Sequence, residues 1–175
     1  NLGAPLEKHI LVTCGGSNPN GLSAEILLAL QYVTVPITVI IGPYFGEKLQ
    51  NRLTKMTQSF ADCRLIVHPT DLTPYLLDAS LVVGRPGLIR YEAAAMGRHG
   101  LYLFDGDEYE DYFRYFSNSK VAKIHHQNEP NARKNFFAEL SKLSDADHVP
   151  NKLNSIALCV IDGQGAARVA KAIRC

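Results

Sequence analysis

The sequence has no tryptophan, only two methionines, and no apolar run of the length that a membrane helix needs. A helix that crosses a bilayer takes about 20 apolar residues, and the most apolar stretch, residues 37–42, is far shorter. We therefore expect no transmembrane segment. Residues 1–8 begin with Asn and have no signal-peptide layout. They read as a linker that follows a missing N-terminal domain, which leaves residues 9–175 as one domain.

The four cysteines show neither a CxxC pair nor the His-spaced pattern of a zinc site: they are Cys14, Cys63, Cys159 and Cys175. We expect no metal site and no disulfide scaffold, and this cysteine usage suits a reducing cytoplasm. Cys14 falls in an apolar strand, where a small buried thiol is the expected reading.

Positive charge is neither abundant nor clustered. Lys and Arg number 18 against 17 Asp and Glu, for a formal net charge of +1. Nucleic-acid binding normally leaves a basic patch or basic and aromatic residues interleaved. Neither pattern is visible, so a nucleic-acid partner is not expected.

Two common cofactor signatures are also missing. No GxGxxG follows the first strand, and strand two ends in Gly42-Pro43-Tyr44 without the acidic residue that binds a ribose. No Gly-Lys-Ser/Thr of a P-loop is present either. NAD and ATP chemistry are therefore disfavoured, and no cofactor is expected.

What the sequence does have is a regular alternation of short apolar runs and amphipathic stretches. This pattern is typical of βα units, and it predicts an α/β fold with a Rossmann-like parallel sheet flanked by helices. Strands are expected at residues 10–14, 37–42, 64–68, 81–84, 101–104 and 121–125. Helices are expected at residues 22–31, 45–56, 72–78, 89–96, 109–116, 132–143, 149–159 and 166–173.

The turn after the first strand, Cys14-Gly15-Gly16-Ser17-Asn18, is the first candidate site. Ligands on open parallel sheets bind beyond the carboxyl ends of the strands. Adjacent glycines let the backbone approach an anion, and the next helix presents free N–H groups. A tight turn, with a helix capped by Ser17, Asn18 or Asn20, explains the same residues equally well.

A second glycine turn, Gly84-Arg85-Pro86-Gly87, follows the fourth strand and leads into a helix that carries Glu92. A carboxylate there could accept two hydrogen bonds from a ribose diol, or it could be an ordinary acid near a helix N-terminus. Arg85 and Arg90 could neutralise a diphosphate. For each arginine alone, a surface position is favoured.

The C-terminal segment Asp162-Gly163-Gln164-Gly165 reads as a turn that opens a last helix with a face of small residues. Small residues allow close packing against another element. A helix docked on its own domain is the slightly favoured interpretation.

Taken together, the three motifs resemble the C-terminal, nucleotide-binding half of GT-B-fold enzymes that act on UDP-sugars. The first strand with Gly-Gly-Ser-Asn-Pro (Ile10–Pro19) and Asp-Gly-x-Gly-Ala-x-Arg (Asp162–Arg168) are similar to the UDP-sugar hydrolase of pseudaminic acid synthesis and to spore-coat polysaccharide glycosyltransferases. Arg85, Gly87 and Glu92 match the middle motif of the peptidoglycan UDP-GlcNAc transferase.

This resemblance implies a nucleotide site in which Gly15, Gly16 and Ser17 face the diphosphate and Glu92 holds the ribose. The loop from His68 and Pro69 to Asp71 would lie beside the base. The implied nucleotide-binding set is Gly15, Gly16, Ser17, Asn18, His68, Pro69, Arg85, Gly87 and Glu92. The sequence departs from the family pattern where Pro86, Leu88 and Ile89 replace hydroxyl residues, and where Asp105-Gly106-Asp107-Glu108 replaces an Asn-Gln pair.

The function implied is that of the donor-binding domain of a GT-B glycosyltransferase or UDP-sugar hydrolase, in surface polysaccharide or nonulosonate synthesis. Its partners would be a UDP-sugar and an N-terminal GT-B domain, in cis or in trans. The family's catalytic base lies in that other half, and the final helix often crosses back onto it. No catalytic residue is assigned in this chain, which is expected to be inactive alone. The alternatives are a non-catalytic nucleotide-sugar-binding or subunit-interaction module, and a structural domain without a ligand.

Overall fold

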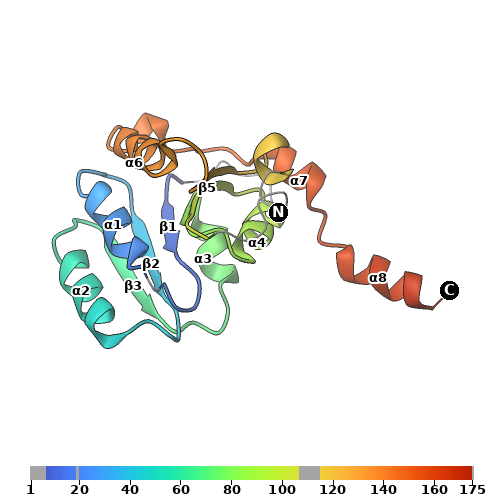
Figure 1. Ribbon diagram of the computed structural model, residues 1–175, viewed down its shortest axis with the longest axis horizontal. Helices are drawn as coiled ribbons and strands as arrows, with labels where there is room; N and C mark the ends of the chain where they lie inside the picture. Colours follow the sequence, from blue (N-terminus) through green and yellow to red (C-terminus); the bar gives the residue numbers. More distant parts are fainter. Residues whose placement is uncertain (1–6, 19, 107–114, 175) are drawn as a thin grey trace.

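The computed structural model of the chain describes residues 7–18, 20–106 and 115–174. Six parallel strands form one sheet in the order β3-β2-β1-β4-β5-β6 (Figure 1). The strands are β1 (Ile10–Thr13), β2 (Ile37–Ile41), β3 (Cys63–Val67), β4 (Leu81–Gly84), β5 (His99–Phe104) and β6 (Lys123–His126). The predicted Rossmann-like α/β class is confirmed.

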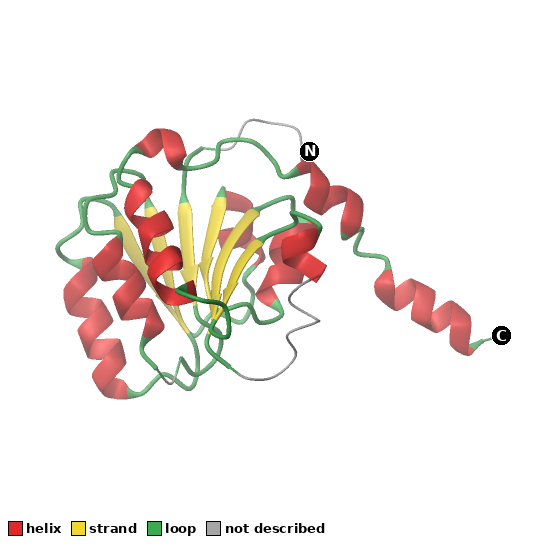
Figure 2. Cartoon of the chain, turned by 45° about the horizontal axis from the view of Figure 1, so that its top comes forward, coloured by secondary structure: helices red, strands yellow, loops and turns green. Residues whose placement is uncertain are grey.

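Helices cover both faces of the sheet (Figures 1 and 2). The helices are α1 (Leu22–Ala29), α2 (Glu47–Thr57), α3 (Thr73–Asp78), α4 (Ile89–Ala95), α6 (Ala132–Lys142), the 3-10 helix η1 (Ala146–His148), α7 (Ser155–Val160) and α8 (Gly165–Ile173), and residues 115–118 are also helical. The helix predicted at residues 109–116 lies mostly outside the described residues, as does most of the linker predicted at residues 1–8.

Two hydrophobic cores lie on opposite faces of the sheet. Ile10 and Val12 of β1 belong to the core that includes α1, α2 and α6, while Leu11 belongs to the core with α3, α4 and α7. Because successive side chains of a strand point to opposite faces, both faces of a doubly covered strand must be apolar. All residues of β1, β2 and β4 are buried accordingly.

The N-terminal ends of two helices differ from the predictions, α1 in its cap and α7 in its first residue. Gly21, in the left-handed conformation, is the N-cap of α1, so neither Asn18 nor Asn20 caps it. The helix predicted from residue 149 begins only at Ser155, because the Asn154 side chain accepts a hydrogen bond from the Ala157 N–H.

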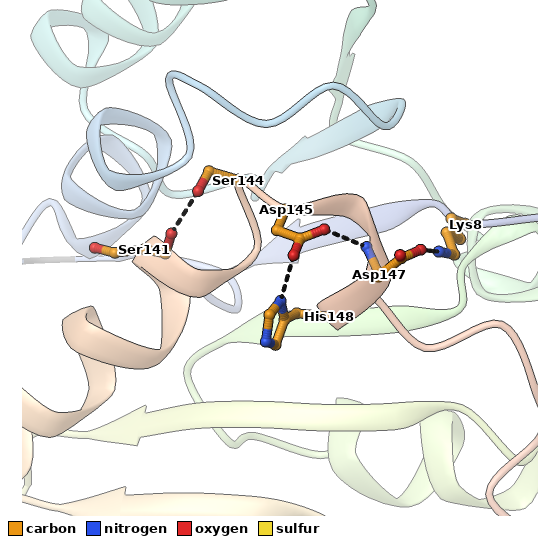
Figure 3. A network of polar contacts seen from close by, with 6 residues as sticks. All are labelled: Lys8, Ser141, Ser144, Asp145, Asp147 and His148. Carbon is orange, nitrogen blue, oxygen red and sulfur yellow. Dashed lines mark hydrogen bonds and ion pairs between the residues drawn. The ribbon is translucent and has the colours of Figure 1, made fainter.

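A surface network at the amino end of β1 joins the start of the domain to η1 (Figure 3). Lys8 Nζ lies 3.0 Å from Asp147 Oδ1, and Asp145 accepts the Asp147 N–H at 3.0 Å. Asp145 also approaches His148 Nδ1 at 3.3 Å. Exposed pairs of this kind contribute little stability. Since Lys8 precedes β1, the network lies at the sheet edge opposite the strands' carboxyl ends.

Helix α8 projects away from the rest of the molecule (Figure 2). Every residue of α8 is exposed, and none is buried. The prediction that this helix docks on its own domain is therefore wrong. Its small-residue face packs against none of the residues that the structure describes. No described helix combines the length and apolar character that a membrane span requires.

Candidate functional site

A pocket of about 390 Å3 opens at the carboxyl ends of β1, β2 and β4. In this strand order the chain reverses direction across the sheet between β1 and β4, and open α/β sheets bind ligands at that point. The pocket is lined by Thr13, Gly15, Gly16, Ile40, Gly42, Pro43, Pro69, Leu72, Gly87, Leu88, Ile89 and Glu92. It brings together five of the nine residues predicted to bind nucleotide.

The first glycine turn is held tightly between the neighbouring strands. Gly15 has a φ of +77°, which residues with a β-carbon rarely adopt. A β-carbon on Gly42 would overlap the Gly15 carbonyl oxygen and lie 2.5 Å from that of Gly16. The Tyr44 N–H donates to the Gly16 carbonyl at 2.9 Å. The end of β2 thus fixes the backbone of the turn.

Ser17 and Asn18, predicted to be part of this site, are not among the pocket-lining residues. Ser17 is exposed, while Asn18 is buried with a φ of +44°. The Asn18 side-chain amide donates to the Ser23 hydroxyl, and the backbone carbonyl of Asn18 accepts the Gly21 N–H at 3.1 Å. Asn18 therefore shapes the loop from within.

Most side chains that line the pocket are apolar: Ile40, Pro43, Pro69, Leu72, Leu88 and Ile89. Pro69, which belongs to the loop predicted to lie beside the base, is one of these lining residues. His68 is exposed, has a φ of +50°, and does not line the pocket; its N–H donates to the Ile41 carbonyl at 2.9 Å. The backbone of His68 turns the chain so that Pro69 faces inward.

Arg90 has a different position from the one predicted. It is 4% exposed, and its Nη1 donates to the carbonyls of Pro86 at 3.0 Å and Gly87 at 2.7 Å. Its guanidinium also lies 4.5 Å from the centre of the Tyr91 ring. The surface interpretation is therefore wrong: Arg90 folds back onto the turn that precedes α4. Glu92, two residues further along α4, is exposed and lines the pocket.

Arg85 does not line the pocket either. Its Nε lies 3.0 Å from Asp105 Oδ1, and the guanidinium stands over the Phe104 ring. The other carboxylate oxygen of Asp105 accepts a hydrogen bond from the Asn20 amide at 2.7 Å. Arg85 is half-buried and ion-paired, so a simple surface position does not describe it. Asp107, Glu108 and the acidic residues that follow lie outside the described residues.

Cys14 lies directly before the turn and is buried. Burial raises the pKa of its thiol to about 12, because a low-dielectric environment disfavours the thiolate. The predicted small buried thiol is confirmed.

The sequence-based prediction missed several residues that line the pocket, chiefly Thr13, Gly42 and Leu72. Gly84 has a φ of +150°, and a β-carbon there would overlap the carbonyl oxygen of Thr13. The two glycines could have been found in the sequence. Gly42 directly follows β2 and Gly84 ends β4, and these are the two strands that flank β1.

Comparisons with solved structures agree with the fold described above. MurG of Acinetobacter baumannii superposes with a TM-score of 0.70 at 19% identity, over 99% of this chain and 50% of that chain. The S. aureus MnaA–UDP structure gives 0.68 at 15% identity, over 96% of this chain and 46% of that one. The fold of this chain matches about half of each of these GT-B structures.

Other solved structures of similar fold include the glycosyltransferases WaaG and VinC and two UDP-N-acetylglucosamine 2-epimerases. Among curated proteins, the uncharacterised protein MJ1062 of Methanocaldococcus jannaschii is 26% identical over 126 residues, which is 67% of this chain and 25% of that protein. No family model matches the sequence. The chain thus spans about half the length of the solved structures and a quarter of the curated relative.

Proposed function

We propose that this chain is the donor-binding half of an enzyme that acts on a nucleotide-sugar, with a UDP-sugar as the favoured ligand. The observation that supports it best is the pocket where Gly15, Gly16, Pro69, Gly87 and Glu92 converge at the carboxyl edge of the sheet. These residues are far apart in the sequence, and the fold brings them to the point where such sheets bind ligands.

In this proposal the ligand lies across the pocket from an apolar to a polar end. The base packs against Pro69 and Leu72, and the exposed Glu92 carboxylate accepts hydrogen bonds from the ribose diol. The diphosphate lies at the Gly15–Gly16 turn, whose two residues have no side chain of their own to keep it from the backbone. Backbone N–H groups would stabilise the charge that develops on a leaving diphosphate.

The chemistry itself would need a second domain, in cis or in trans, facing this edge of the sheet. A glycosyltransferase or a UDP-sugar hydrolase of surface polysaccharide or nonulosonate synthesis fits the sequence motifs at Ile10–Pro19 and Asp162–Arg168. The presence of UDP in the S. aureus structure of similar fold supports the choice of nucleotide.

Calorimetric titration of the chain with UDP, GDP and CMP tests the binding site. We expect UDP to bind and Glu92→Gln to weaken it about tenfold, the loss of one charge-assisted hydrogen bond. Glu47→Gln is the matched control, since Glu47 is also exposed in the first turn of a helix.

The ribose role of Glu92 predicts a further selectivity. Glu92→Gln should weaken uridine more than 2′-deoxyuridine, because the deoxy compound lacks one of the two hydroxyls. Equal losses for the two nucleosides would remove the ribose role, and no binding of any nucleotide at millimolar concentration would refute the site.

A non-catalytic binding or subunit-interaction module is the second candidate. Two observations favour it: Pro86, Leu88 and Ile89 offer no hydroxyl at the second glycine turn, and α8 exposes Val169 and Ile173. Phosphorus NMR of UDP-N-acetylglucosamine, incubated with the chain together with a candidate N-terminal half, separates the two. Release of UDP supports the enzyme, and binding without turnover supports the module.

A further inference from the structure

The charge of the pocket is unusual for a diphosphate site. Of the described residues that line it, Glu92 is the one with an ionisable side chain, and it is acidic. A diphosphate would therefore meet backbone groups and a nearby negative charge, without a lysine or arginine from the described lining.

Both arginines near the second glycine turn, Arg85 in the turn and Arg90 in α4, are held by other groups of the protein. Arg90 donates to the carbonyls of Pro86 and Gly87, in the turn before α4, at 3.0 and 2.7 Å. The Nε of Arg85 lies 3.0 Å from Asp105 Oδ1. The side chains of Arg85 and Asp105 are 34% and 16% exposed, so the pair is shielded from water more than a surface ion pair. A partly desolvated arginine–carboxylate pair is costly to break, because the carboxylate would be left without its partner.

Asp105 also joins two of the loops that line the pocket. Its Oδ1 pairs with Arg85 after β4, and its Oδ2 accepts the Asn20 amide from the loop after β1 at 2.7 Å. Asp105 itself follows the end of β5. One carboxylate at the carboxyl edge of the sheet thus fixes both loops and neutralises the guanidinium between them.

We propose that Asp105 is a specificity-determining residue that withholds Arg85 from the ligand's phosphates, so that the site selects nucleotides mainly through the neutral nucleoside. This inference rests on the proposed function. The base and ribose provide most of the affinity through Pro69, Leu72 and Glu92. Among the described residues of the lining, backbone groups hold the phosphates, and no guanidinium is available to bind additional negative charge.

A ladder of uridine, UMP and UDP tests this in the wild-type chain. We expect the three dissociation constants to lie within about tenfold of one another, since a single charge-assisted contact is worth about that factor. UDP affinity should also change little between low and high salt, because the described lining contributes no lysine or arginine to it. A preference for UDP over uridine of about a hundredfold or more, or a steep fall with salt, overturns the proposal.

Asp105→Asn is the decisive variant, because it keeps the size and one oxygen acceptor for Asn20 but removes the charge that holds Arg85. UDP should then bind about tenfold more tightly and become salt-sensitive, with uridine changed by less than about twofold. Asp105→Asn combined with Arg85→Gln should return UDP to the wild-type affinity. A merely structural role of Asp105 would weaken UDP and uridine together, and that result would overturn the proposal.

Arg85→Gln alone is a second, independent variant that does not depend on the folding of Asp105→Asn. We expect its UDP affinity to stay within about twofold of wild type, whereas loss of a direct phosphate contact would cost about tenfold or more. The two levels of failure remain distinct. Compounds that bind without the expected selectivity refute the role of Asp105 alone, and absence of all binding refutes the proposed function as well.

Discussion

Gly84 and Thr13 are paired across neighbouring strands so closely that a β-carbon on Gly84 would overlap the Thr13 carbonyl oxygen. The other side of β1 repeats this relationship, since a β-carbon on Gly42 would clash with the turn that follows β1. The loop after β1 is therefore confined by glycines on both flanking strands. Those glycines determine where the pocket lies.

Replacing Gly42 by alanine tests this confinement. The new methyl group would push the Gly15–Gly16 turn away, and overpacking of this kind costs about 1–3 kcal/mol in the free energy of unfolding. Urea denaturation measures it. Gly165→Ala is the control, because its β-carbon would meet open space in an exposed helix. A Gly42→Ala protein as stable as the control variant would contradict the confinement.

Arg90→Lys should destabilise the protein although it preserves the charge. A lysine ammonium cannot reproduce the planar guanidinium that donates to the Pro86 and Gly87 carbonyls while stacking on Tyr91. We expect a loss of about 2 kcal/mol in the free energy of unfolding, since the Pro86 and Gly87 carbonyls lose a charged donor. Denaturant melts check it against Arg52→Lys on the exposed surface of α2. Equal melts for the two variants would rule out this anchoring role.

The strands could be predicted from the sequence, whereas the side-chain contacts at their ends could not. Short, mostly apolar runs rich in β-branched residues, such as Ile37–Ile41, favour buried strands, and the strand predictions lie within about two residues of the structure. Local periodicity carries that information, because it follows from which faces are covered by helices.

Contacts between distant residues are not encoded in local spacing. Arg90 and Arg85 look alike in the sequence, yet one folds back onto its own turn and the other pairs with Asp105, which lies 20 residues further along. Asn18 was a reasonable cap, but the left-handed Gly21 starts α1 instead. These outcomes depend on how loops from β1, β4 and β5 meet at one edge.

The Cys14 thiol should be unreactive in the folded protein. Its pKa of about 12 lies above the usual 9.0, so the folded state keeps the proton between these values while the unfolded chain loses it. Stability attributable to this group is complete below pH 9 and falls as the pH rises towards 12. In a variant with Cys63, Cys159 and Cys175 replaced by serine, Ellman's reagent at pH 8 should label Cys14 only upon denaturation. Rapid labelling of the native protein would refute this.

Removal of residues 162–175 should leave the stability of the domain unchanged. No residue of α8 is buried, and an isolated helix shorter than about 12 residues is marginal in water. We expect the melting temperature to shift by no more than about 2 °C, as for a change below about 0.5 kcal/mol. Calorimetry of the truncated chain measures it, and a large drop would show that α8 contacts the domain in solution.

The ion pair at the start of α8 can be tested without any partner. Arg168 contacts both carboxylate oxygens of Asp162, at 2.6 and 3.0 Å, and this hydrogen bonding lowers the pKa of Asp162 to about 2. The stabilisation that the pair gives to the turn is therefore present above the usual pKa of 3.8 and is lost as the pH falls towards 2. Arg168→Gln should return the Asp162 pKa towards its ordinary value in a carboxyl NMR titration, whereas Lys171→Gln in the same exposed helix should leave it unchanged. Because α8 is exposed along its whole length, an unaltered Asp162 pKa in Arg168→Gln would mean that the pair does not form in solution.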